Sequence, residues 1–123
     1  MNIKFSDNAL NLKITEAELE RLNAGESVAT EGTIADRRLA FRIIPASGLD
    51  AIQSDYSADE DETVLEFYTP ANDIATLAAM GRSKHGLCLQ ESDPEITLQV
   101  DIRADTREKT VKLQNATNKR DKT

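Results

Sequence analysis

The chain has 123 residues and a net charge of −7, from 15 lysines and arginines against 22 aspartates and glutamates. Apolar residues make up 39% and aromatic residues 4%, a composition typical of one soluble domain with a lean aliphatic core. No apolar run approaches the ~18 residues that a membrane span needs, and the acidic balance argues against nucleic acid as a partner. A single cysteine excludes an internal disulfide and indicates a cytoplasmic protein.

The first half of the chain predicts four strands and one helix. Two short alternating segments around Ser6-Asp7-Asn8 predict an N-terminal hairpin. Thr15 and Glu18 have the spacing of a capping box, and a glycine follows the apolar stripe, so we expect a helix over Thr15–Ala24. Two further strands are expected over residues 28–34 and 38–44.

The second half repeats this order. Thr69 is interpreted as a cap residue and Pro70 as the first helical residue, which predicts a helix over Pro70–Met80. Strands are expected over residues 51–57, 63–69, 86–91 and 95–103. The repeated order suggests a duplicated ββαββ unit with halves at residues 2–44 and 51–103. Independent recurrence of common caps and turns is the alternative.

Together these elements predict a single α+β domain over residues 1–104. Because short hairpins dominate, we expect a mainly antiparallel sheet, strongly curved or barrel-like, with two helices. Residues 105–123 hold six basic and three acidic residues with little apolar content, so we expect a flexible basic tail. The lean core also favours a homodimer, which buries more apolar surface per chain.

Residues 2–19, NIKFSDNALNLKITEAEL, resemble the start of a family of small bacterial proteins of unknown function. Those proteins open with two strands of alternating basic residues, a turn that holds Asn, and a helix after Leu-Thr. The segment 65–70, LEFYTP, is similar to their later strand that ends in proline before a second helix. This chain departs from the pattern at Asn2 and Asn11, where the family tends to have basic residues. The resemblance implies a fold and a bacterial setting, and no activity.

Motifs for catalysis or cofactor binding are absent from the sequence. There is no G-x-G-x-x-G, P-loop or G-x-S-x-G motif, so we expect no cofactor and no catalytic residue. His85 and Cys88 are three apart, but zinc would need further ligands, so we expect no metal site, a loop histidine and a buried cysteine. A Cys–His nucleophilic pair is the alternative. The run Asp59-Glu60-Asp61-Glu62 lacks calcium-loop spacing and is interpreted as a solvated turn.

One group of basic residues is a candidate ligand-binding site. Alternation places Ile3, Phe5, Leu39, Phe41 and Ile43 toward the core. The opposite face then holds Lys4, Lys13, Arg38 and Arg42, and Arg103 joins them from the last strand. On an open sheet this face is solvated, whereas inside a closed barrel it would bind a phosphorylated or polycarboxylate ligand.

Two functions follow from these observations. We favour a non-catalytic module that acts through contact with an unknown protein partner, because the sequence has almost no motifs for nucleophiles, metal ligands or cofactor loops. The alternative is an anion- or phosphate-binding barrel, including a phosphoester-processing enzyme. Whether the sheet closes around Arg38 and Arg42 distinguishes the two.

Overall fold

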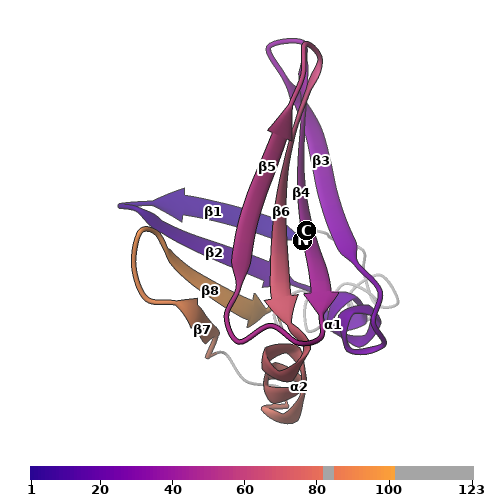
Figure 1. Ribbon diagram of the computed structural model, residues 1–123, viewed down its shortest axis with the longest axis vertical. Helices are drawn as coiled ribbons and strands as arrows, with labels where there is room; N and C mark the ends of the chain where they lie inside the picture. Colours follow the sequence, from indigo (N-terminus) through magenta and orange to yellow (C-terminus); the bar gives the residue numbers. More distant parts are fainter. Residues whose placement is uncertain (82–84, 102–123) are drawn as a thin grey trace, which may run out of the picture.

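The computed structural model describes residues 1–81 and 85–101, and Figure 1 shows the chain as a ribbon. The described part has two helices, α1 (Glu16–Asn23) and α2 (Ala71–Ala79). Its eight strands are β1 (Asn2–Ser6), β2 (Ala9–Ile14), β3 (Val28–Ile34), β4 (Arg37–Ala46), β5 (Gln53–Ala58), β6 (Glu62–Pro70), β7 (Leu87–Gln90) and β8 (Glu95–Val100). The predicted α+β class and element order are confirmed. The expected tail over residues 105–123 lies outside the described residues.

The strands form two open four-stranded sheets, so the prediction of one strongly curved or barrel-like sheet is wrong. Sheet A has the order β1-β2-β8-β7 and sheet B has the order β3-β4-β6-β5. The outer pairs of each sheet are antiparallel hairpins, as predicted. The central pair is parallel in both sheets, joining β2 to β8 and β4 to β6, which the sequence did not predict.

The path of the chain explains this arrangement. The chain passes from β2 in sheet A through α1 to β3 in sheet B, and returns from β6 through α2 to β7 in sheet A. Each sheet therefore joins one hairpin from the first half of the chain to one from the second half. Parallel neighbours need a long connection rather than a tight turn, so the local turn signals could not reveal them.

Local capping signals fix the first helix. The backbone N–H of Glu18 donates to the Thr15 hydroxyl at 3.0 Å, and the Glu18 carboxylate accepts from the Thr15 N–H at 2.9 Å. The same carboxylate pairs with the N-terminal amine at 3.1 Å, which ties the start of β1 to α1. The predicted helix with its capping box is confirmed.

The second helix begins one residue later than expected, at Ala71 instead of Pro70. Pro70 is the N-cap of α2, and no side chain caps the helix by a hydrogen bond. Thr69 is instead fully buried at the end of β6, where its hydroxyl donates to the carbonyl of Phe67 at 3.2 Å. The pairing of β6 with β4 continues to Pro70, and this holds Thr69 in the sheet.

The core lies where the two sheets and the two helices meet. The helices lie next to each other at the lower end of sheet B in Figure 1. The fully buried apolar side chains come from both sheets and both helices, namely Leu12, Ile14, Leu22, Ile43, Ile74, Leu77, Ile96 and Leu98. Sheet A packs against only part of sheet B, and the hairpin ends of sheet B extend past it (Figure 1).

Candidate interaction surface

The predicted basic residues lie on two different sheets. Lys4 and Lys13 lie on β1 and β2, on the face of sheet A opposite the core. Arg38 and Arg42 lie on β4, on the outer face of sheet B. Arg103 lies outside the described residues. The expected single basic face is therefore divided, because β1 and β2 pair with β8 rather than with β4.

The two arginines of sheet B form ion pairs on their own sheet. Arg38 contacts Glu31 at 3.5 Å, and Arg42 contacts Glu66 at 3.3 Å. These partly exposed pairs are worth about 0–1 kcal/mol each. Tyr68 donates its hydroxyl to Glu66 at 3.1 Å, and this hydrogen bond, with the negative charge of the carboxylate, raises the pKa of Tyr68. The outer face of sheet B thus mixes both signs of charge.

The inner face of sheet B differs in chemistry from this outer face. Beyond the part covered by sheet A it presents apolar side chains from all four strands. We call this surface the open face and define it by Ile34, Leu39, Phe41, Tyr56 and Leu65. Ile34 is 66% exposed and Tyr56 is 69% exposed, while the other three are half-buried. Phe41 lies opposite Leu65, and Leu65 lies opposite Tyr56, so these three form one apolar row across the strands. Leu39 lies opposite Gly32 and Thr63, and Ile34 lies opposite Arg37.

The crossing of the two sheets explains why the open face is uncovered. In Figure 1 the strands of sheet A run across those of sheet B rather than alongside them. Sheet A therefore covers only part of the length of β4, which has ten residues, and of β6, which has nine. A cavity of about 300 Å³ lies at the boundary, with Met1 and Ile3 on one side and Ile34, Leu39 and Phe41 on the other.

The open face corrects the set of core residues that the sequence predicted. Leu39 and Phe41 were expected to be core residues, as Ile43 is, but they lie beyond the region that sheet A covers and are only half-buried. Phe5 was also expected in the core, yet it is 63% exposed near the outer end of β1. The alternation identified the correct side of each strand, but not how far the opposing sheet reaches.

One charged side chain, that of Arg37, lies at the outer end of the same face. Its guanidinium donates to the hydroxyl of Thr63 at 2.8 Å and to the carbonyls of Glu60 at 3.1 Å and Glu62 at 3.3 Å. The group is therefore engaged by the β5–β6 turn. The open face offers a partner an apolar surface with its one cation already hydrogen-bonded.

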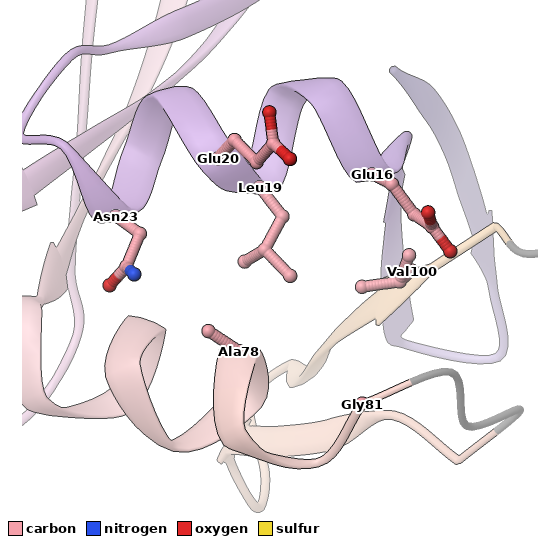
Figure 2. A pocket seen from close by; sticks show the side chains of 7 residues that line it. All are labelled: Glu16, Leu19, Glu20, Asn23, Ala78, Gly81 and Val100. Carbon is pink, nitrogen blue, oxygen red and sulfur yellow. The ribbon is translucent and has the colours of Figure 1, made fainter.

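A second recess lies between the helices. Figure 2 shows Leu19 on α1 pointing toward Ala78 on α2, and the recess measures about 250 Å³. Glu16, Glu20 and the end of β8 at Val100 also line it. Its carboxylates make it acidic, so it does not suit the anionic ligand that the sequence suggested. Because Leu19 and Ala78 face each other across it, we interpret it as the junction between the packed helices.

The described residues offer little for metal or nucleophile chemistry. Within residues 1–81 and 85–101 no three His, Cys, Asp or Glu side chains gather in a way that could hold a metal ion. Cys88 is exposed, so the prediction of a buried cysteine is wrong. It pairs with Thr97, while its neighbour Leu87 pairs with the buried Leu98 on the other face. In the same ranges no helix is long and apolar enough to cross a membrane.

Comparison with known proteins gives no precedent for this surface. A scan against protein-family models, a search of curated proteins and a search of solved structures each found no match.

Proposed function

We propose that this protein is a non-catalytic interaction module that binds a protein partner through the open face. The observation that carries the proposal is the exposure of Ile34 and Tyr56, 66% and 69%, on a face that they share with the half-buried Leu39, Phe41 and Leu65. Contiguous apolar surface on a soluble protein typically marks an interaction site. We place this function in the reducing cytoplasm, in keeping with a single, exposed thiol.

The energetics support contact with another apolar surface. Complete burial of a large apolar side chain is worth about 1.5–3 kcal/mol, so covering two side chains that are two-thirds exposed contributes roughly 1–2 kcal/mol each. Tyrosine suits such a position, because its ring packs against apolar groups while its hydroxyl finds a polar partner at the rim. The half-buried Leu39, Phe41 and Leu65 would add smaller amounts.

The anion-binding alternative has less support. It requires a closed basic interior, whereas both sheets are open. Lys4 and Lys13 lie on a different sheet from Arg38 and Arg42, and each of these two arginines has a glutamate partner. Anion binding is therefore the second candidate function, and a titration with phosphate anions tests it.

We also propose that the fold arose by duplication of a ββαββ unit. A displacement of 55 residues relates equivalent positions in the two halves: Leu12 to Phe67, Thr15 to Pro70, Leu22 to Leu77 and Ile43 to Leu98. Because Leu12 pairs with Leu98 and Ile43 pairs with Phe67, this displacement exchanges the two central parallel pairs. On this proposal the longer strands that carry the open face are where the two units diverged.

Photo-crosslinking tests the proposed function. A photoreactive phenylalanine analogue at position 34 lies on the open face, and the same analogue at position 33 lies on the outer face of the same strand. In extracts of the cells that make the protein, we expect protein adducts from position 34 and few from position 33. Equal adducts from both positions, or none from position 34, would contradict the proposal.

A further inference from the structure

We propose that the partner of the open face is the open face of a second copy of this chain, related by a two-fold axis. This inference rests on the proposed function and names the occupant. A two-fold contact uses the same surface on both copies, so that surface must be complementary to itself. Aliphatic and aromatic groups meet this condition, because any apolar group packs favourably against another.

Charge restricts where two copies can meet. Each copy carries a net charge of −7, so most contacts between two copies would bring acidic surfaces together. The open face reduces this repulsion, because none of its five defining residues is acidic, and the acidic β5–β6 turn lies at its outer end. The charged residues of the same strands, such as Glu31, Asp55 and Glu66, lie on the opposite side of the sheet.

The inner part of the same face shows how a second sheet would pack on it. Ile43 and Phe67 belong to the same inner face and are buried in the core that the two sheets and the two helices share. The open face continues these rows outward with the same class of side chains. A second copy would extend the existing two-layer packing, with the sheets about 10 Å apart.

The available area predicts a weak dimer. Four strands about 4.8 Å apart and about five residues long give a flat area of roughly 300 Å² per copy. Residues of β1 at the boundary, Met1 and Ile3, would add to it. Stable complexes bury about 800 Å² per partner, so this contact belongs to the weak class. We expect dissociation constants on the order of 10–100 µM.

Sedimentation equilibrium of the full chain tests the inference. We expect a monomer–dimer equilibrium in this concentration range, tightened by added salt, because salt screens the repulsion between two acidic copies. The double variant Ile34→Glu/Tyr56→Glu should be monomeric throughout, because two-fold contact would bury four unpaired carboxylates. The matched control Thr33→Glu/Ser57→Glu adds the same charge to the same strands on the outer face and should dimerise like the parent chain.

The outcomes separate this inference from the proposed function. A concentration of about 300 µM is well above the expected dissociation constants. A parent chain that stays monomeric there would overturn self-association. Adducts from position 34 to other proteins would then still support the open face as a docking surface. A dimer that persists in the Ile34→Glu/Tyr56→Glu variant would place the contact elsewhere and overturn the inference. If the double variant unfolds, Ile34→Glu alone, at a residue two-thirds exposed, provides the same comparison.

Discussion

Phe41 lies directly opposite Leu65 in the parallel pairing of β4 with β6, and both side chains are only half-buried. Two residues further along each strand, Ile43 lies opposite Phe67, and both are buried. The boundary of the core therefore falls between two consecutive rows of one sheet. Residues with the same pattern in the sequence thus have different roles, packing in one row and an accessible surface in the next.

Truncations along β4 should show this boundary. Ile43→Ala removes a fully buried side chain and should lower the free energy of unfolding by about 2–5 kcal/mol. Leu39→Ala, on the same face of the same strand, should cost about 1 kcal/mol or less, because the side chain is partly in solvent. Urea unfolding of both variants measures the difference. Equal losses would show that the open face is covered within a single chain.

The sequence predicted the features that depend on neighbouring residues. Thr15 and Glu18 are three residues apart, and their capping box forms as expected. The partners of the central strands were not predictable in the same way, since Leu12 pairs with Leu98 at a separation of most of the chain. Such pairings depend on how the two halves pack, and no local turn signal records them.

The acidic β5–β6 turn provides a prediction about pH. The Asp59 carboxylate accepts hydrogen bonds from the N–H groups of Asp61 and Glu62, both at 2.8 Å, and these hold its pKa below the ordinary value of 3.8. A lowered pKa in the folded state means that the ionised form is favoured. The contribution is fully present above pH 3.8 and is lost as the pH falls through the lower folded value.

Asp59→Ala should therefore lower the melting temperature at pH 7, and the difference from the parent chain should shrink as the pH falls well below 3.8. Thermal unfolding monitored by circular dichroism, at pH 7 and at a pH well below 3.8, measures this difference. The variant Asp59→Asn keeps an oxygen acceptor and separates the role of the charge from that of the hydrogen bonds. A difference that is constant or grows toward acid would contradict the assignment.

Deleting residues 107–123 should leave the body of the protein as stable as before. This segment has only Val111, Leu113 and Ala116 as apolar residues, too few to contribute much burial. We expect a change in melting temperature of less than about 2 °C, because a loss of 1 kcal/mol would shift it by roughly 4–8 °C. A drop of several degrees in differential scanning calorimetry would show that the segment packs on the folded body.

Anion titration distinguishes the two functional classes. Millimolar phosphate, pyrophosphate or tripolyphosphate should leave the melting temperature unchanged, because the basic residues are divided between two sheets. A ligand that binds only the folded state would raise it. A dose-dependent rise that is lost in Arg38→Gln/Arg42→Gln, and retained in the control Lys4→Gln/Lys13→Gln, would instead favour the anion-binding function.

The sequence predicted only part of the open face. Alternation placed Leu39, Phe41 and Ile43 on one side of a strand, which is correct. The first two lie where the ten-residue β4 runs past the strands of sheet A that cross it. Strand ends are weakly marked in a sequence, and the span that the opposing sheet covers depends on distant pairings. The exposure of Ile34 and Tyr56 could therefore be recognised only from the three-dimensional structure.

Methyl NMR of the full chain tests the central claim most directly, because it reports on each face separately. Ile34, Leu39 and Leu65 mark the open face, and Ile44, opposite Tyr68, marks the outer face of the same sheet. On raising the concentration of the chain, or on adding extract of the cells that make it, we expect the open-face signals to shift or broaden while Ile44 stays unchanged. Changes confined to Ile44, or an open face unaffected under both conditions, would contradict the open face as the interaction surface.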